Sequence, residues 1–193
     1  MDAMYESLYR LAAESSIVPF EKWRRRVQVF IDSVSDKKDI ASRLLFLVAR
    51  KGSVDASLTL IEFGADVNYA DDSGVLICET LLFPLSTSGV GLLPVLSTFI
   101  ASGLNPNAKN GSGTPLLHVA LSAGAIAHAV LLMTHGADPF FCDPDSHDTA
   151  FDVAARLHPV VVASQLRECA VCDPTEWKRI QNMCCSPVEK EKR

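Results

Sequence analysis

Apolar side chains near the N-terminus recur at the spacing of an amphipathic helix. Over residues 20–34 they stand three or four positions apart, with polar residues between most of them. The set is Phe20, Trp23, Val27, Phe30, Ile31 and Val34. Pro19 precedes them, and its fixed φ suits the first turn of a helix. Together with a second helical segment at 4–13, this pattern predicts a helical N-terminal extension over residues 1–37 that covers the exposed end of another part of the molecule.

Two long stretches in the middle of the chain are almost free of charge. Residues 75–101 contain one charged residue, Glu79, and residues 110–137 contain none. A hydropathy scan would read such stretches as membrane spans. Proline and glycine interrupt the first, Pro115 and His118 interrupt the second, and neither stretch has flanking aromatic anchors. We therefore expect helices buried on several sides, and no insertion into a membrane.

Three segments of the chain end in the same way. They are IEFGADVNYADDSG at 61–74, IASGLNPNAKNGSG at 100–113 and MTHGADPFFCDPDS at 133–146. Their glycines, at 64, 103 and 136, are 39 and 33 positions apart. Glycine also stands twelve positions before the first and the third of them, where a turn between two helices would need positive φ. The longer second unit predicts an elongated loop between helices at 86–92.

The 33-residue spacing resembles the period of ankyrin repeats, each of which is a β-turn followed by two antiparallel helices. GTPLLHVALSAG at 113–124 resembles the ankyrin signature with one extra leucine, and HDTAFDVAARL at 147–157 resembles a closing unit. The resemblance implies an all-α, ankyrin-repeat solenoid of about four repeats over 38–170. VVVASQLREC at 160–169 would be the second helix of the last repeat. A C-terminal helix and charged tail at 171–193 would cap the far end, as the 1–37 extension caps the near one.

The same resemblance implies a surface that binds other proteins, because turns and first helices line a concave groove in such stacks. It assigns partner contacts to Tyr69, Asp71, Asp72, Asn107, Lys109, Asn110, Phe140, Phe141, Asp143 and Asp145. Adjacent phenylalanines in a turn are unusual and would be candidate hot spots, unless they pack internally. The acidic set predicts a partner that offers basic or polar groups. The function expected from this surface is that of a non-catalytic adaptor or scaffold.

Composition narrows the function further. The 193 residues carry a net charge of −5, so the basic footprint of a nucleic-acid-binding protein is missing. The N-terminus has Asp2 and Glu6 where a signal or transit peptide needs positive charge, which predicts a cytoplasmic protein. A basic run, Lys22 and Arg24 to Arg26, can bind acidic partners, membrane surfaces or RNA, but we expect it to be the solvated face of its helix.

The C-terminal cysteines are the sharpest candidate for metal chemistry. Cys169 and Cys172 form a two-residue-spaced pair, but Cys184 and Cys185 are adjacent and a predicted helix separates the two pairs. Adjacent cysteines rarely both face one zinc ion, so we predict free thiols and no cofactor.

The histidines do not make up a catalytic site. They form no recognisable catalytic order with serine, cysteine or aspartate, and His118 is expected to hydrogen-bond the backbone of a turn. The sequence also has no phosphate-binding loop. We therefore predict no enzymatic activity.

Three other functions remain open. The chain would be a structural subunit of a large assembly if the terminal helices and the 86–92 loop were docking elements. It would be a substrate adaptor of a ubiquitin-ligase type if the C-terminal segment recruited the enzyme, although no recognisable box sequence is present. A membrane-associated protein would need detergent for purification.

Overall fold

The computed structural model describes residues 3–82 and 92–157. Within these residues the chain forms nine α-helices and no strand, which confirms the predicted all-α class. In chain order the helices are α1 (Ala3–Glu14), α2 (Phe20–Asp32), α3 (Lys37–Ala49), α4 (Val54–Glu62), α5 (Glu79–Leu82), α6 (Leu93–Ala101), α7 (Leu116–Ser122), α8 (Ile126–Thr134) and α9 (Ala150–Leu157).

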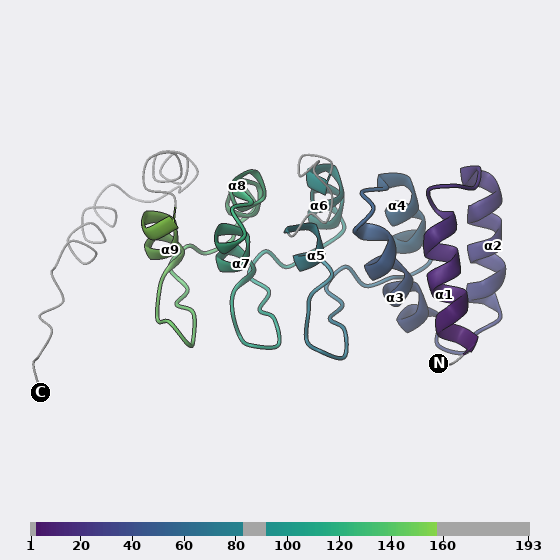
Figure 1. Cartoon of the computed structure of the whole chain (residues 1–193), viewed down its shortest axis with the longest axis horizontal. Coiled ribbons are helices and arrows are strands. Elements are labelled where there is room, and N and C mark those ends of the chain that lie inside the picture. Colours follow the sequence, from purple (N-terminus) through teal and green to yellow (C-terminus); the bar gives the residue numbers. More distant parts are fainter. Residues whose placement is uncertain (1–2, 83–91, 158–193) are drawn as a thin grey trace, which may run out of the picture.

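The helices form an elongated stack with two rows (Figure 1). One row consists of α3, α5, α7 and α9, each in contact with the next, and the second consists of α4, α6 and α8. Long loops join the second row back to the first and project from one edge of the stack (Figure 1). Because each helix pair buries its apolar face against the pairs beside it, the core runs along the whole stack.

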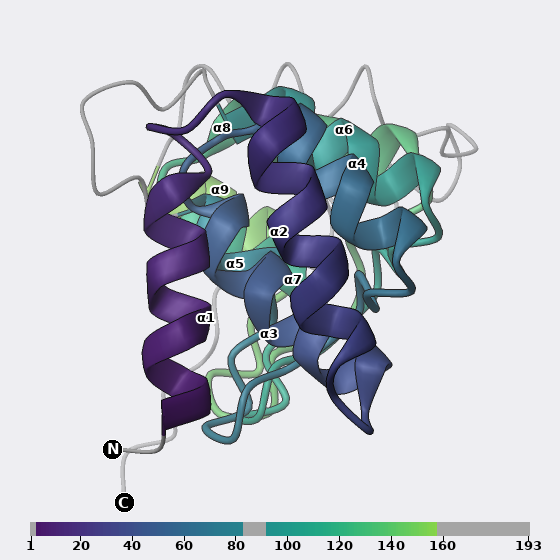
Figure 2. The same ribbon diagram turned by 90° about the vertical axis from the view of Figure 1, so that its right-hand side faces the viewer.

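The two N-terminal helices lie side by side across one end of the stack (Figure 2). Helix α1 packs on α3, and α2 packs on α3 and α4. The inward face of α2 is made of Trp23, Val27 and Ile31, all buried. These are apolar positions predicted from their helical spacing, and they cover the end of the stack as expected.

Local side-chain hydrogen bonds begin several helices. Asp36 accepts from the backbone N–H of Asp39 at the start of α3, at 3.0 Å. Thr149 and Asp152 bond each other's backbone N–H groups before α9, at 2.8 and 3.3 Å, which is a capping box. The glycines of the repeated segments end α4, α6 and α8 with φ between +92° and +94°, in the left-handed region that favours glycine.

Some predicted features lie outside the described residues. Apart from Leu92, the elongated loop at 86–92 is one of them. The others are the helix at 160–169 and the C-terminal helix and tail at 171–193.

The two uncharged stretches contain α5 and α6, and α7 and α8. Most residues of α5 and α7 are buried, whereas α6 and α8 bury one face each. No helix in residues 3–82 or 92–157 is both long enough and apolar enough to cross a membrane.

Candidate functional site

Three loops project side by side from one edge of the stack (Figure 1). Hairpin 1 is residues 63–78, hairpin 2 is 102–115 and hairpin 3 is 135–149. Hairpins 1 and 2 each contain one antiparallel bridge, and the N–H of Gly111 donates to the carbonyl of Gly74 at 2.8 Å to join them. We call the outer surface of the three loops the hairpin edge. The three hairpins together contain all ten residues that the sequence assigned to partner contacts.

The residue that opens each turn is used inside its own hairpin. One side-chain oxygen accepts two backbone N–H groups in every case, at 2.9 to 3.1 Å. The three residues are Asp71, Asn110 and Asp143. Bonds of this kind hold a tight turn in place of backbone pairing. These side chains therefore shape the hairpin edge from within.

The prediction that Asp143 is displayed by its turn is wrong. Asp143 is only 9% exposed, and its carboxylate accepts hydrogen bonds from the N–H groups of Asp145 and Ser146 in the same hairpin. Hydrogen bonds together lower the pKa of Asp143 to about 2. The largest contribution comes from the backbone N–H of Ser146, and the Thr114 hydroxyl and the N–H of Asp145 also contribute. The carboxylate thus stabilises hairpin 3 and ties it to hairpin 2.

We expect Asp143→Ala to lower the free energy of unfolding by about 2 kcal/mol at neutral pH, because it leaves two part-buried N–H groups of the turn without an acceptor. The folded pKa lies below the ordinary aspartate value of 3.8, so the stabilisation is present above that value and is lost as the pH falls toward 2. Urea unfolding at a series of pH values should therefore show the gap between variant and wild type closing over this range. Asp145→Ala, at an exposed neighbour, is the control and should cost under about 0.5 kcal/mol. Equal effects of the two substitutions would contradict the structural role of Asp143.

Two asparagines brace neighbouring hairpins. The amide of Asn68 accepts from the N–H of Asn105 at 2.7 Å and donates to the carbonyl of Gly103 at 3.0 Å. Asn107 makes the same pair of bonds one hairpin further along. Its amide accepts from the N–H of Asp138 at 2.7 Å and donates to the carbonyl of Gly136 at 2.9 Å. Asn107, expected to contact a partner, thus has both ends of its amide committed to the spacing between hairpins.

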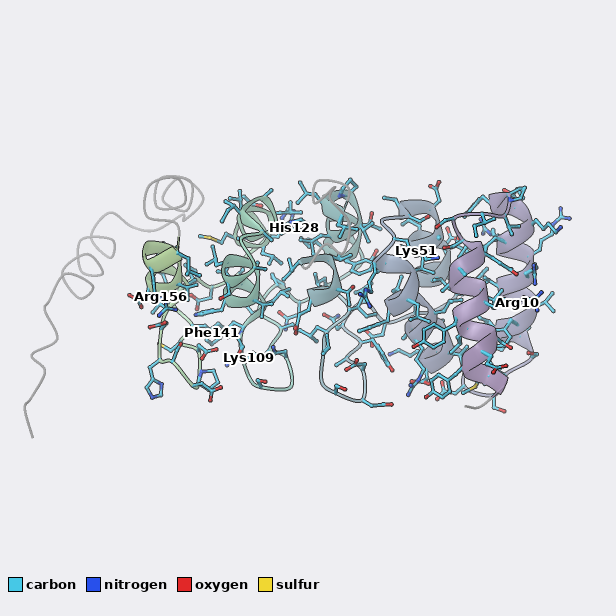
Figure 3. The ribbon with its side chains drawn as sticks, in the orientation of Figure 1. Arg10, Lys51, Lys109, His128, Phe141 and Arg156 are labelled. Atoms are coloured by element: carbon cyan, nitrogen blue, oxygen red, sulfur yellow. The ribbon has the colours of Figure 1, made fainter. Side chains whose placement is uncertain are left out.

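The adjacent phenylalanines of hairpin 3 differ in their surroundings. Phe140 is half-buried and packs on Phe151 of α9, with ring centroids 5.5 Å apart. Phe141 is 37% exposed, and the ammonium of Lys109 lies 4.6 Å from its ring centroid (Figure 3). That arrangement is a cation–π contact between hairpins 2 and 3. Phe141 is therefore the aromatic of this pair that a partner can reach.

The remaining predicted residues lie at the surface or line a pocket. Asp72, Lys109 and Asp145 are exposed, and the side chain of Asp72 is 81% accessible. Tyr69 is half-buried, and burial raises the pKa of its hydroxyl. The hairpin edge thus offers carboxylates on hairpins 1 and 3. It also offers the ring of Phe141, with the ammonium of Lys109 beside it.

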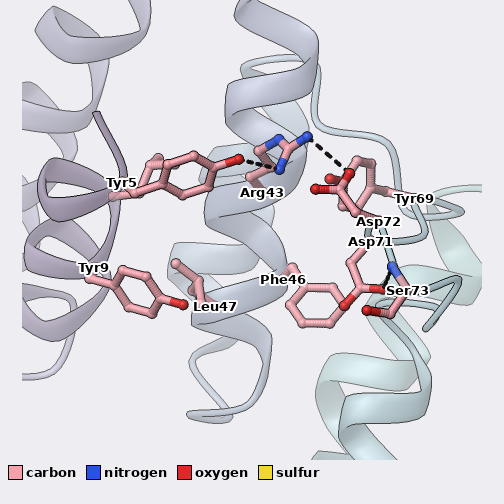
Figure 4. A pocket seen from close by; sticks show the side chains of 10 residues that line it. Tyr5, Tyr9, Arg43, Phe46, Leu47, Tyr69, Asp71, Asp72 and Ser73 are labelled. Atoms are coloured by element: carbon pink, nitrogen blue, oxygen red, sulfur yellow. Dashed lines mark hydrogen bonds and ion pairs between the residues drawn. The ribbon is translucent and has the colours of Figure 1, made fainter. Parts of the chain in front are cut away.

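A pocket of about 270 Å³ lies between α1, α3 and hairpin 1 (Figure 4). We call it the tyrosine pocket. Its lining residues are Tyr5, Leu8, Tyr9, Arg43, Phe46, Leu47, Tyr69, Asp71, Asp72 and Ser73. Sequence reasoning found Tyr69, Asp71 and Asp72 and missed the aromatic residues of α1 and α3. The four-residue spacing of Tyr5 and Tyr9 on a helical segment was a signal that could have found them.

Arg43 organises the tyrosine pocket. Its guanidinium donates to Asp39 at 2.7 Å, to the Tyr5 hydroxyl at 3.0 Å and to Asp72 at 3.4 Å. It also lies within about 6 Å of the ring centroids of Tyr5 and Tyr69. The hydrogen bond that Arg43 donates to the carboxylate of Asp39 is the main cause that raises the pKa of Arg43. The long contact to the exposed Asp72 is the weakest of these bonds, so Asp72 is the group that can turn to a ligand.

The two buried histidines lie in neighbouring helices, His118 in α7 and His128 in α8. His118 donates from Nε2 to the carbonyl of Asp148 in hairpin 3 at 2.9 Å, which confirms its predicted role in a turn. His128 in α8 is buried, and burial lowers its pKa. Among the residues that the structure describes, no three His, Cys, Asp or Glu side chains are placed to hold a metal ion. The C-terminal cysteines at 169, 172, 184 and 185 lie outside them.

No protein-family model matches the sequence, and no curated protein is significantly similar to it.

Proposed function

We propose that this chain is a non-catalytic adaptor that binds another protein through its hairpin edge and tyrosine pocket. We further propose that its stack is an ankyrin-type solenoid of about four repeats. The spacings of 33 and 39 between equivalent glycines support this assignment. So do the pairs of antiparallel helices joined by projecting hairpins, and the equivalent turn residues at 71, 110 and 143.

The observation that carries the proposal is that some hairpin residues hold the loops in place while others remain exposed. The turn-opening residues and the bracing asparagines hold the loops in a fixed row, while Asp72, Lys109, Phe141 and Asp145 remain at the surface. A rigid, preorganised row of loops loses little conformational entropy when a partner binds. An exposed aromatic among charges is the composition typical of an interface hot spot and its rim.

The charges on this surface favour a particular partner. Hairpin 1 carries Asp71 and Asp72 beside the tyrosine pocket, and hairpin 3 carries Asp145, against one exposed lysine at 109. The partner that fits is a protein segment with lysine or arginine side chains near an apolar residue. The apolar residue would contact Phe141 or enter the tyrosine pocket, and the basic groups would face the aspartates.

The experiment begins with capture of the partner from native extract by the tagged full chain and its identification by mass spectrometry. Dissociation rates are then measured with purified partner. Phe141→Ala should raise the dissociation rate about 30-fold, the equivalent of a 2 kcal/mol hot spot. Leu58→Ala is the matched control, since Leu58 is a similarly exposed apolar residue, at 41%, but lies on α4. It should leave the rate unchanged.

The rim charges are tested separately. Asp72→Asn with Asp145→Asn should slow association at low salt and change little at high salt, because solvent screens these charges. Asp71 is left unchanged because its carboxylate holds the turn. Asp55→Asn on α4 is the control. If all the hairpin substitutions leave binding unchanged while changes in α1 and α2 abolish it, the hairpin edge is idle and the structural-subunit alternative replaces this proposal.

A further inference from the structure

The outer end of the molecule carries a hollow between α1 and α2. Its volume is about 480 Å³, within the range of ligand-sized cavities. Six of its residues carry the argument, and we call them the end face: Arg10, Leu11, Arg25, Arg26, Val29 and Phe30. Arg10 lies at the end of the stack away from Phe141 (Figure 3). The end face shares helix α1 with the tyrosine pocket but none of its lining residues, and it lies apart from hairpin 3.

The charge of the end face is positive. Three arginines line the hollow, and no carboxylate does. Glu14 pairs with Arg10 at 3.3 Å and with Arg26 at 2.8 Å, so one negative charge serves two of them. Arg25 is exposed and forms no ion pair or hydrogen bond with the described part of the chain. About two positive charges are thus left for a ligand, in a chain whose net charge is −5.

The floor of the hollow is apolar. Leu11 is buried at its base, Phe30 is half-buried, and Val29 is 70% exposed. Val29 stands four positions after Arg25 and three after Arg26, so one stripe of α2 presents charge and apolar surface together. The end cap of a helical stack needs only a polar outer face. A cap does not require a hollow with an apolar floor and a rim of arginines, so this feature is unexplained by the capping role alone.

We propose that the end face binds an acidic amphipathic helix of a partner protein. Its apolar side chains would enter the hollow over Val29 and Phe30, and its carboxylates would pair with Arg10 and Arg25. The guanidinium fork suits this role, because it binds carboxylates in a bidentate way. A helix laid in a groove is a recurring mode of peptide recognition. A membrane surface fits less well, because insertion into lipid needs a protruding apolar face and this one is concave.

The probe is a fluorescent synthetic helix of about 18 residues, with leucines along one face and glutamates beside them. A second peptide carries glutamine in place of every glutamate. The full-length chain should bind the acidic peptide saturably and the glutamine peptide at least about tenfold more weakly. Hydrogen exchange with bound peptide should show protection in α1 and α2 and none in the three hairpins.

Two variants test the assigned residues. Arg25→Glu and Val29→Asp should each weaken binding of the acidic peptide by about tenfold or more. Arg25 and Val29 are exposed and make no contact that the fold needs, so circular dichroism should be unchanged. Arg50→Glu makes the same charge change at an exposed site just after α3 and is the matched control. The affinity of the Arg50→Glu variant for the acidic peptide should stay within about twofold of that of the wild type.

Several outcomes would overturn the proposal. One is equal binding of the acidic peptide by Arg25→Glu, Arg50→Glu and wild type. Another is protection confined to the hairpins. Binding to vesicles rich in phosphatidylserine, with no saturable binding of the peptide, would assign the end face to a membrane. Concentration-dependent self-association that Arg25→Glu abolishes would assign it to a second copy of the chain. The hairpin edge is tested with other residues, Phe141, Asp72 and Asp145, so the two proposals can fail separately.

Discussion

Replacing Trp23 by alanine is expected to lower the free energy of unfolding by about 4 kcal/mol, near the upper end for a single substitution. Trp23 is fully buried at the junction of α1, α2 and the stack. Its indole N–H donates to the carbonyl of Leu11 at 2.8 Å, near the C-terminal end of α1. The ammonium of Lys51 donates to the next carbonyl, that of Ala12, at 2.5 Å. Removal of the indole would leave a cavity and also free a carbonyl that helps to hold α1 in place.

Urea unfolding followed by far-UV circular dichroism measures this loss. Trp23→Phe is the informative control, because it keeps much of the buried apolar surface while it removes the indole hydrogen bond and part of the ring volume. We expect it to cost about 1–2 kcal/mol. Hydrogen exchange should show that Trp23→Ala loosens α1 and α2 before α7 and α8, since each layer of a stack is stabilised mainly by its neighbours. A uniform loss of protection, or a cost near zero, would mean that α1 and α2 do not depend on this residue.

The helices of this chain could be predicted because their signals are local. The spacing of Trp23, Val27 and Ile31 identifies both the helix and its buried face. The glycines at 64, 103 and 136 mark where α4, α6 and α8 end, since few other residues adopt their positive φ. Periodicity and turn chemistry operate over a few residues, so a single sequence displays them directly.

The roles of the hairpin residues could not be predicted in the same way. An aspartate in a loop is ordinarily assigned to the surface, and Asp143 was assigned there. Its oxygen instead faces the backbone of its own turn, as do those of Asp71 and Asn110. The recurrence of Asp or Asn at the same place in all three hairpins was a usable signal, because these residues stabilise turns through such bonds.

The two hollows depend on contacts between distant parts of the chain. Arg43 meets Tyr5 across 38 positions and Asp72 across 29, and no local pattern connects them. The basic run at 22–26 was expected to be only a solvated face, because the sequence could not place Arg10 of α1 and Val29 of α2 around one hollow. Surfaces formed by packing of separate elements become visible only once those elements are placed in three dimensions.

Replacing Gly74 by alanine is expected to lower the free energy of unfolding by about 3 kcal/mol. Two effects contribute, backbone strain and crowding, and substitutions at two other glycines measure each effect alone. Its φ of +78° is strained for alanine. A Cβ there would also lie 2.6 Å from the Cα of Gly111, which forces hairpins 1 and 2 apart. Gly103 has φ of +93° with no atom within 4 Å of its Cβ position, so Gly103→Ala should show strain alone, about 1 kcal/mol.

Gly111→Ala completes the comparison by isolating the crowding. Its Cβ would lie 2.9 Å from the Cα of Gly74 and 3.2 Å from the carbonyl oxygen of Ser73, and its φ is not positive. Separation of the hairpins would also weaken the hydrogen bond from Gly111 to Gly74, so we expect about 2 kcal/mol. Thermal and urea unfolding of the three variants should rank Gly74→Ala as the most destabilising and Gly103→Ala as the least. If Gly111→Ala costs nothing and Gly74→Ala costs no more than Gly103→Ala, close approach of the backbones contributes nothing and backbone strain alone explains the cost at Gly74. The expected ranking would instead mean that the spacing of the hairpin edge is set where two glycines let the first two loops touch.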